Sequence, residues 1–363
     1  MIVIVNGKSD HPLIQIVKYY ELLTIMIFFL RIFSRSQLGL NNLISMLIIL
    51  FVSPSIGIAQ SLNEVRDLGI EIPSSDERPA GVIEIDAIFD GYPVTYIHDV
   101  VYANYGEREL VLNIMLPSLD SVNPYPLVVF IQGSGWLPQN VYRSLPNFVN
   151  FARAGYVIAS VEYRHSREAI APAQVQDVKA AIRFMRANAE RYGLDPSKVA
   201  VWGTSSGGHL AALVGASAGV GSFLTQDNLD QSSEVQAVID FFGPTDFRRM
   251  DDYPSQINHS HASSPESLVV GGPIQTQAVA EIVAGYNPIN YISSDRPLPP
   301  FLIVHGDIDE LVPFNQSTLL YKELREAGKE VTFYRVNGAG HGSGIFSKQM
   351  MKIVKDFLDQ HLR

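Results

Sequence analysis

The sequence of 363 residues contains no cysteine, and this absence excludes several kinds of protein at once. A chain without thiols forms no disulfide, holds no metal through thiolates and carries no lipid on an N-terminal cysteine. Cationic residues are also scarce, with 27 Lys and Arg against 37 Asp and Glu and a net charge of −10. Such a balance disfavours the basic surfaces that bind nucleic acids or anionic membranes. We therefore expect no nucleic-acid partner.

The first sixty residues differ in composition from the rest of the chain. Residues 43–52 are an apolar run that follows Arg31 and Arg35 and precedes small residues up to Ala59. A basic segment, a short apolar segment and a small-residue cleavage site are the parts of a secretory signal peptide. We therefore predict a signal peptide within 1–59, cleaved after Ala59, and a periplasmic or extracellular mature protein.

This signal peptide lies unusually deep in the chain, because such segments normally begin at the first methionine. We expect translation to start nearer residue 26, or at an alternative codon. The alternative is an uncleaved membrane anchor made from the apolar residues 13–33 and 43–58. If the signal is cleaved, no stable membrane partner is expected.

Beyond residue 80 the sequence indicates one large domain. With 47% hydrophobic residues the chain can bury a substantial core. Apolar runs alternate with helical stretches, as a parallel sheet flanked by helices requires. Eight strands are predicted, at residues 94–102, 108–116, 126–132, 156–162, 198–203, 235–242, 300–305 and 330–336.

Two helices and one irregular stretch complete this plan. Residues 172–192 have an amphipathic helical pattern, and the last helix is expected near 345–361. Residues 217–299 break the alternation, and we expect a lid or cap insertion there, between the sixth and seventh strands. His259 and His261 in this stretch have no apparent third ligand for a metal, so we expect them in a solvated loop.

The pattern Gly-x-Ser-x-Gly occurs at residues 203–207, between an apolar strand and a helical stretch. A serine at such a junction occupies a tight, strained turn that lifts its hydroxyl clear of the backbone. The glycines are needed because side chains there would collide with the sheet or the next helix. Ser205 is the candidate nucleophile, since Ser206 would need glycine at 204, where the chain has threonine.

A serine nucleophile needs a base, and an acid that orients the base. In this arrangement the acid comes first in the chain and the histidine follows it. The predicted strand at 330–336 runs into a glycine-rich loop that contains His341, the candidate base. The polar turn after the strand at 300–305 offers two acids. We prefer Asp309, and expect Asp307 to hold the turn by accepting bonds from backbone amides.

Ester chemistry at this serine also needs N–H donors for the oxyanion. One is the backbone N–H of Ser206, the residue after the nucleophile. We expect the second from Gly133 or Ser134, in a glycine-rich turn after the strand at 126–132. An ordinary glycine turn is the alternative. Trp136, beside this turn, is a candidate wall of the substrate pocket, with simple burial as the alternative.

Together these motifs resemble the bacterial esterase/lipase group of the α/β-hydrolase superfamily, the acetyl-esterase and feruloyl-esterase-like (BD-FAE-like) proteins. The resemblance covers residue 96 to the C-terminus. It is carried by residues 113–117, 130–136, 163–166, 172–177, 192–199, 202–210, 287–291, 305–313 and 338–342. The family pattern Asp-x-x-Val-Pro falls on Asp309. The chain departs from the family's His-Gly-Gly-Gly motif at Gln132 and Ser134, which affects the expected shape of the acyl pocket.

The resemblance implies an α/β-hydrolase fold, with a mostly parallel eight-stranded sheet, helices on both faces and a small lid. It implies a serine esterase without metal or cofactor that acts on short-chain acyl esters, acetyl or feruloyl-type, including esters of carbohydrates. We divide the chain into residues 1–59, an extended leader at 60–80 and a catalytic domain at 81–363.

Three other functions fit parts of this pattern. An amidase or formamidase would use the same three residues on an amide. Prolyl-oligopeptidase-like peptidases share the order of the triad but usually carry a propeller domain, for which 304 mature residues leave no room. A non-catalytic binding protein on this fold would typically lack a triad residue, and this chain has all three candidates.

Overall fold

The computed structural model describes residues 2–6, 81, 83–86, 93–117 and 123–363. The chain divides into two compact units, one of residues 1–8 and 89–363 and the other of residues 9–88. The first unit contains the sheet and every predicted site residue. The predicted cleavage after Ala59 and the leader at 60–80 lie outside the described residues.

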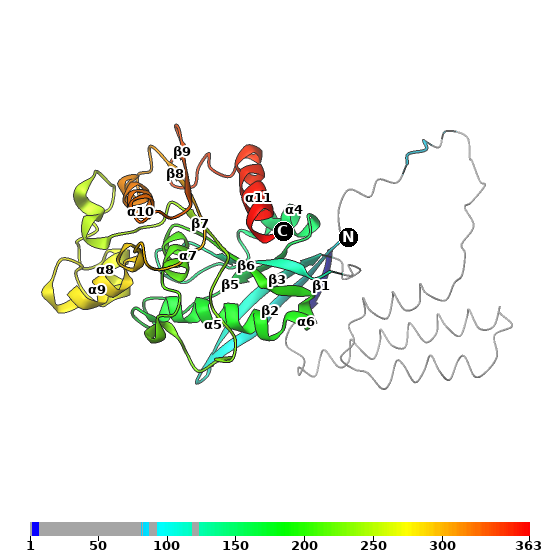
Figure 1. The fold of residues 1–363 in the computed structure, drawn as a ribbon, viewed down its shortest axis with the longest axis horizontal. Coiled ribbons are helices and arrows are strands. Elements are labelled where there is room, and N and C mark those ends of the chain that lie inside the picture. Colours follow the sequence, from blue (N-terminus) through cyan, green and yellow to red (C-terminus); the bar gives the residue numbers. More distant parts are fainter. Residues whose placement is uncertain (1, 7–80, 82, 87–92, 118–122) are drawn as a thin grey trace. The chain divides into compact units, whose positions relative to one another are not determined.

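In the described part of the chain, nine strands form one sheet in the order β1-β2-β3-β5-β4-β6-β7-β8-β9 (Figure 1). Their bounds are β1 Ile2–Asn6, β2 Val94–Tyr105, β3 Arg108–Pro117, β4 Tyr125–Ile131, β5 Val157–Val161, β6 Leu194–Thr204, β7 Ala237–Phe241, β8 Phe301–Gly306 and β9 Val331–Val336. Strand β3 pairs antiparallel with β2 and β5, and all other pairs are parallel.

All eight strands predicted from the sequence are present, and the mostly parallel α/β fold is confirmed. The ninth strand, β1, pairs in parallel with β2 from Ile2 opposite Val94 to Asn6 opposite His98. The sequence analysis did not predict it, because residues 1–59 were assigned to the segment removed with the signal peptide.

Helices cover both faces of the sheet (Figure 1). Helices α5 (Ala173–Ala187), α7 (Ser206–Ala216) and α10 (Asn315–Glu326) pack in one apolar cluster, and α4 (Val149–Arg153) and α11 (Lys348–Leu362) pack in another on the opposite face. Strand residues alternate between the two clusters. In β4, Leu127 and Val129 belong to the first and Val128 and Phe130 to the second. This double burial explains why the central strands are continuously apolar.

The predicted helix at 172–192 is interrupted. It forms α5 and the short α6 (Ala189–Tyr192), which meet at Asn188. The side chain of Asn188 donates to the carbonyl of Phe184 at 2.9 Å, beside the backbone N–H of the same residue at 3.1 Å, and a side-chain bond back to the preceding turn bends a helix. Gly193, at φ 60°, ends α6 in the left-handed conformation that glycine adopts without strain.

The predicted insertion at 217–299 was drawn too widely, since it includes β7, which pairs with β6 and β8 inside the sheet. The segment without sheet strands runs from residue 242 to 300, between β7 and β8. It contains η3 (Phe247–Asp252), α8 (Pro265–Val270), η4 (Gln277–Val279), α9 (Ala280–Tyr286) and η5 (Pro288–Tyr291), and a short η2 (Gly221–Phe223) precedes β7.

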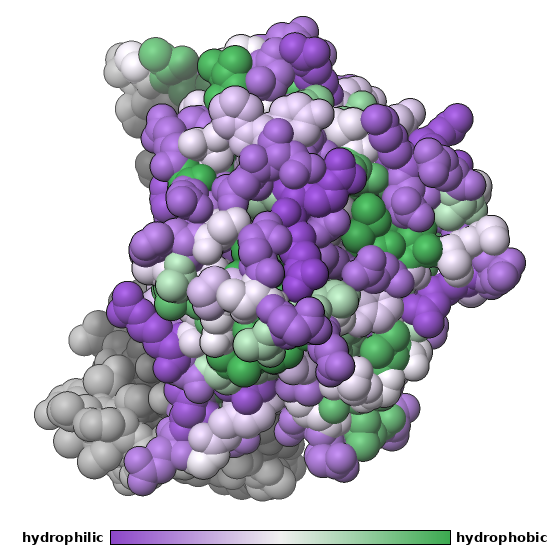
Figure 2. Space-filling view, turned by 90° about the vertical axis from the view of Figure 1, so that its left-hand side faces the viewer, coloured by the Kyte–Doolittle hydropathy of each residue, from purple (hydrophilic) through white to green (hydrophobic). Residues whose placement is uncertain are grey.

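The insertion is bonded to the loop that follows β8. The backbone N–H of Gln256 donates to the carbonyl of Glu310 at 2.8 Å, and the Ser255 hydroxyl donates to the carbonyl of Leu311 at 3.0 Å. The face of the molecule that carries the insertion is mostly hydrophilic, with small separate apolar patches (Figure 2). Among the described helices, none combines the length and the hydropathy that crossing a membrane requires.

Candidate active site

Ser205 stands between β6 and α7 in a strained conformation, with φ 55° and ψ −126°. Such a backbone is costly for a residue other than glycine and is held here by its surroundings. The N–H of Ser205 donates to the carbonyl of Phe241 at 2.9 Å, and its own carbonyl accepts from the N–H of His209 at 3.0 Å. A side chain at Gly203 would collide with Gly207, which explains the glycine at that position of the motif.

The three predicted triad residues come together at the carboxyl ends of the strands. His341, in the loop after β9, has Nε2 at 3.0 Å from the Ser205 hydroxyl and Nδ1 at 2.8 Å from Oδ2 of Asp309. Asp309, in the loop after β8, has a fully buried side chain. This is the geometry in which a histidine takes a proton from the serine while a carboxylate holds the opposite ring nitrogen.

The carboxylate of Asp309 is bonded on both oxygens. Its Oδ1 accepts the backbone N–H groups of Leu311 and Val312, both at 2.9 Å. Its Oδ2 lies 2.8 Å from His341 and 3.1 Å from Nε2 of His305. Burial alone would raise the pKa of this carboxyl, but the bonds to the two histidines outweigh it and hold the pKa below the usual range. Asp309 is therefore ionised wherever the histidine works as a base.

Asp307 has the role in the turn that the sequence analysis expected. It accepts the backbone N–H of Gly338 at 2.6 Å and an ion pair from Arg335 at 2.7 Å. The bond to Arg335 keeps the pKa of this partly buried carboxyl below its ordinary value. Asp307 thus connects the loop after β8 to the loop that carries His341, and contacts neither His341 nor Ser205 through any bond in the structure.

The glycine-rich turn after β4 lies directly against the nucleophile. The N–H of Gly133 donates to the Thr204 hydroxyl at 3.1 Å, and the N–H of Ser134 donates to the Ser206 hydroxyl at 2.9 Å. Both predicted oxyanion donors of this turn are thus directed at hydroxyls that flank Ser205. The N–H of Ser206 begins α7, where backbone donors have no acceptor inside the helix. The assignment of the oxyanion hole to Gly133, Ser134 and Ser206 stays a prediction.

Tyr163, a buried residue that the sequence analysis missed, connects this turn to α7, the helix that follows Ser205. The Tyr163 hydroxyl lies 3.2 Å from the Ser134 hydroxyl and 3.3 Å from that of Ser206, and it donates to the carbonyl of Gln132 at 3.2 Å. Burial raises the pKa of Tyr163, so the group is a neutral hydroxyl. Ser134 stands where the family motif has glycine. Its hydroxyl is accommodated because it has two partners, the Tyr163 hydroxyl and the carbonyl of Leu137, to which it donates at 2.6 Å.

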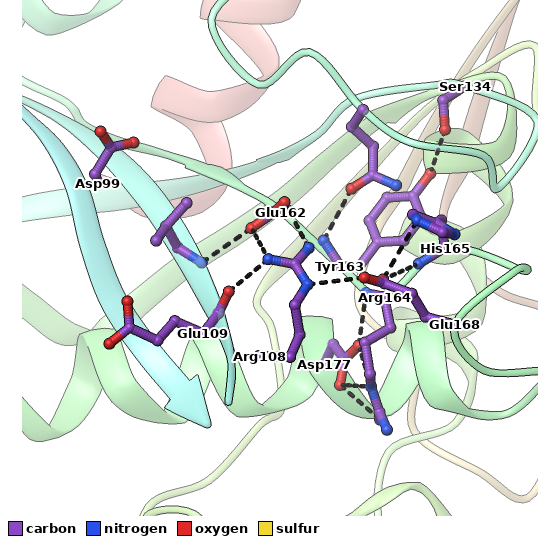
Figure 3. A network of polar contacts seen from close by, with 12 residues as sticks. Asp99, Arg108, Glu109, Ser134, Glu162, Tyr163, Arg164, His165, Glu168 and Asp177 are labelled. Atoms are coloured by element: carbon purple, nitrogen blue, oxygen red, sulfur yellow. Dashed lines mark hydrogen bonds and ion pairs between the residues drawn. The ribbon is translucent and has the colours of Figure 1, made fainter. Parts of the chain in front are cut away.

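Figure 3 shows the Tyr163 hydroxyl bonded to Ser134, and beside it the ion pairs made by residues next to Tyr163 in the sequence. The neighbouring Arg164 forms a bidentate pair with the buried Asp177, and Arg108 binds both Glu162 and Glu168. These ion pairs fix the segment that follows β5. The Tyr163 hydroxyl connects this segment to the Ser134 hydroxyl.

Trp136 is buried, with 1% of its surface exposed, which agrees with the burial alternative for this residue. Its ring packs against the rings of His209 and Phe247, both at 5.2 Å between centroids. His209 in turn bonds through Nε2 to the carbonyl of Tyr286 at 2.7 Å. Burial lowers the pKa of His209 to about 4, so the ring is neutral and joins the elbow helix to α9.

The two histidines of the insertion have partners that leave no set of metal ligands around them. His259 is buried and pairs with Glu266 at 3.0 Å, rather than lying in the solvated loop that we expected, and His261 bonds to the Ser263 hydroxyl. In the part of the chain that the structure describes, no group of three or more His, Cys, Asp or Glu residues is arranged to hold a metal ion.

The fold and the elbow together define the class: this is an α/β-hydrolase-type protein with a Ser-His-Asp arrangement at the carboxyl ends of its strands. The chain belongs to the BD-FAE family, whose model matches residues 112–324.

Among proteins, LipM and Esterase LipC of Mycobacterium tuberculosis are each 30% identical, over 245 and 223 residues. These matches cover 66% and 60% of this chain but 54% and 53% of the relatives, so the chain spans about half the length of the curated relatives it matches.

Among solved structures, a "truncated form of carbohydrate esterase from gut microbiota" is 36% identical, with a TM-score of 0.66 over 75% of this chain and 97% of that one. The propionate-bound esterase Est2 of Thermogutta terrifontis is 26% identical, with a TM-score of 0.59 over 75% of this chain and 95% of that one.

Proposed function

We propose that this protein is a serine hydrolase of carboxylic esters that works through an acyl-enzyme. The observation that carries this proposal is the continuous line of contacts from Ser205 through His341 to Asp309, at 3.0 and 2.8 Å, on a strained elbow. The similarity to esterases at 26–36% identity supports the same reaction.

In this reaction Ser205 attacks the carbonyl carbon of the ester while Nε2 of His341 accepts the hydroxyl proton. Asp309 keeps the other ring proton on Nδ1 and stabilises the imidazolium that forms. The N–H of Ser206 faces the developing oxyanion, joined by Gly133 or Ser134 once that amide exchanges its bond to a neighbouring hydroxyl. The alcohol leaves with the proton from His341. Water, deprotonated by the same ring, then releases the acid and restores Ser205.

We further propose short-chain acyl esters as substrates, including acetyl or feruloyl groups on carbohydrates. Two observations support this proposal. One related structure is described as a carbohydrate esterase, and another esterase has been solved with propionate bound.

The test is hydrolysis of p-nitrophenyl acetate, butyrate and octanoate, acetylated oligosaccharides and methyl ferulate by the full chain. Replacing Ser205 by alanine should lower kcat by about 10⁶-fold, the loss typical of a removed serine nucleophile. If Ser205→Ala keeps more than a few per cent of the activity in a clean preparation, the assignment of Ser205 as the nucleophile is wrong. A folded protein that cleaves p-nitroacetanilide but no ester would be an amidase, and one that cleaves neither would support the binding-protein alternative.

We also propose that the protein is exported, on the basis of the pattern within residues 1–59. N-terminal sequencing of the mature protein from a bacterial host should find Gln60 as the first residue. A mature chain that retains residues 43–58 and sediments with membranes would support the anchor alternative.

A further inference from the structure

A second histidine contacts the catalytic acid and has no part in the mechanism above. His305 lies near the end of β8 and its side chain is fully buried. Its Nε2 is 3.1 Å from Oδ2 of Asp309 and 3.0 Å from the carbonyl oxygen of Val312. Both neighbours are acceptors only, since Asp309 is ionised, so Nε2 must carry a hydrogen.

The other side of the same ring is held by a hydroxyl. Nδ1 of His305 lies 2.7 Å from the Ser317 hydroxyl, in the first turn of α10, and Ser317 is itself fully buried. When Nε2 carries the only ring hydrogen, Nδ1 is an acceptor and the Ser317 hydroxyl donates to it. The rings of Phe242 and Phe314 pack around His305 at centroid distances of 6.3 and 5.4 Å. The ring therefore has one orientation.

His305 and His341 share a single oxygen of the catalytic acid. Both approach Oδ2 of Asp309, at 3.1 and 2.8 Å, while two backbone amides occupy Oδ1. A carboxylate held by four donors cannot rotate about its last bond without losing several of them. A donor to Oδ2 also draws off part of the negative charge that would otherwise stabilise the imidazolium of His341.

We propose that His305, oriented by Ser317, is a positioning residue that fixes the Asp309 carboxylate and moderates the basicity of His341. The proposal rests on the proposed ester hydrolysis, in which His341 is the base. His305 touches no reacting atom and acts only through Asp309.

The proposal predicts a change in pH dependence as well as in rate. Without the His305 donor, the whole charge of Oδ2 acts on His341, which then keeps its proton to higher pH. The acid limb of the kcat/KM profile should move up by about one pH unit, the size expected for one lost charge-assisted hydrogen bond. The other charged groups nearby stay in place: Glu310 accepts the backbone N–H of His341 at 3.3 Å, and Arg335 pairs with Asp307.

The experiment compares four variants of the full chain. His305→Phe removes the donor but keeps a ring, and His305→Gln keeps an N–H near the position of Nε2. Ser317→Ala leaves His305 in place without its hydroxyl partner. Ser217→Ala is the matched control, because Ser217 is an equally buried serine that bonds to the Leu213 carbonyl in α7, and it should match the wild type.

Two readouts are measured against pH: kcat/KM for p-nitrophenyl acetate, and the rate at which a fluorophosphonate labels Ser205. We expect an upward shift of the acid limb and about a tenfold lower rate for His305→Phe, a smaller shift in the same direction for Ser317→Ala, and recovery of the wild-type limb in His305→Gln. If His305→Phe does not fold, judged by its thermal transition, Ser317→Ala against Ser217→Ala decides.

The proposal would be overturned if the acid limb of the kcat/KM profile stayed unchanged in both His305→Phe and Ser317→Ala. It would also be overturned if Ser217→Ala moved that limb as far as these variants do. The labelling readout separates this result from a failure of the proposed function. A wild-type protein that is labelled by the fluorophosphonate but cleaves no ester would refute ester hydrolysis and still report the effect of His305 on the base.

A third readout needs no reaction at all. In Ser205→Ala, proton NMR should show two low-field ring N–H signals, one of which disappears with His305→Gln, and a single signal would contradict the shared oxygen.

Discussion

The two sides of Ser205 are built from different chemistry. On the side of the base, His341 and His305 share a buried, ionised carboxylate that accepts two further backbone bonds. On the side of the glycine-rich turn the bonds next to the nucleophile join neutral groups, and amides bond to the hydroxyls of Thr204 and Ser206. The first side holds a permanent charge, whereas the second faces a charge that exists only during the reaction.

This difference shows what each side must supply. A permanent buried charge needs enough donors to stay ionised, and Asp309 has four. A side that receives a transient charge needs correctly placed dipoles, which neutral groups such as Tyr163 can hold without opposing the reaction electrostatically. Variants on the two sides should therefore differ in kind: those near Asp309 alter pH dependence, and those near Ser134 alter rate alone.

The largest effect is expected from removing the permanent charge. Asp309→Asn should lower kcat by about 10⁴-fold, because a neutral amide neither stabilises the imidazolium nor keeps the hydrogen on Nδ1. The measurement is kcat and KM with p-nitrophenyl acetate. Asp307→Asn is the matched control, two residues away in the same turn, and should stay near the wild-type rate. Comparable losses in the two variants would mean that the turn, and not the charge of Asp309, matters.

A smaller effect is expected on the neutral side. Tyr163→Phe removes the hydroxyl that joins Ser134 to Ser206, and should lower kcat by about tenfold, below the 10²–10³-fold loss for a missing oxyanion donor. The acid limb of kcat/KM should not move, in contrast to the His305 variants. Tyr156→Phe removes an equally buried phenol that bonds to Asp359 on the opposite face, and should leave kcat unchanged. A shifted limb in Tyr163→Phe would break the distinction between the two sides.

The smallest effect is expected on the pH dependence of folding stability, where the buried carboxylates of Asp240 and Asp309 should act in opposite directions. Asp240 at β7 accepts one bond, from the N–H of Gly243 at 2.9 Å, and burial raises the pKa of Asp240 to about 7. The folded state therefore holds this proton more tightly than the unfolded chain, and stability falls as pH rises from the ordinary value of about 4 towards 7. Asp309, whose pKa is lowered, has the opposite effect: it stabilises the fold above about pH 4 and loses that contribution in acid.

The measurement is the unfolding midpoint between about pH 5 and about pH 8, where Asp309 stays ionised. The midpoint should decline with pH in the wild type and decline less in Asp240→Asn, which cannot ionise. Parallel curves for the two proteins would show that Asp240 ionises normally despite its single donor.

The charged side of the site was accessible from the sequence, because its chemistry resides in side chains that follow strands. Ser205, Asp309 and His341 each stand after an apolar run, and parallel strands bring their carboxyl ends to one edge of the sheet. The sheet itself was predictable for a similar reason, since two buried faces require continuous apolar strands.

The neutral side was less accessible, because amides look alike in every sequence. Nothing in the turn showed that Gly133 and Ser134 would donate to the hydroxyls of Thr204 and Ser206. The contact of His305 with Asp309 was equally hidden, since a histidine in an apolar strand is typical of core packing. Its spacing of four residues from Asp309 was the one available signal.

Boundaries failed where local bonds outweigh periodicity. Asn188 interrupts a helix whose apolar stripe continues past it. The polar stretch before β7 led us to begin the insertion at residue 217, although β7 lies inside the sheet between β6 and β8.

The bonds from Ser255 and Gln256 to the loop after β8 have a consequence for engineering this family. They connect the first third of the insertion directly to the segment that carries Asp309. A chimaera that grafts a relative's insertion onto this scaffold should join downstream of Gln256, so that both bonds to the segment that carries Asp309 are retained.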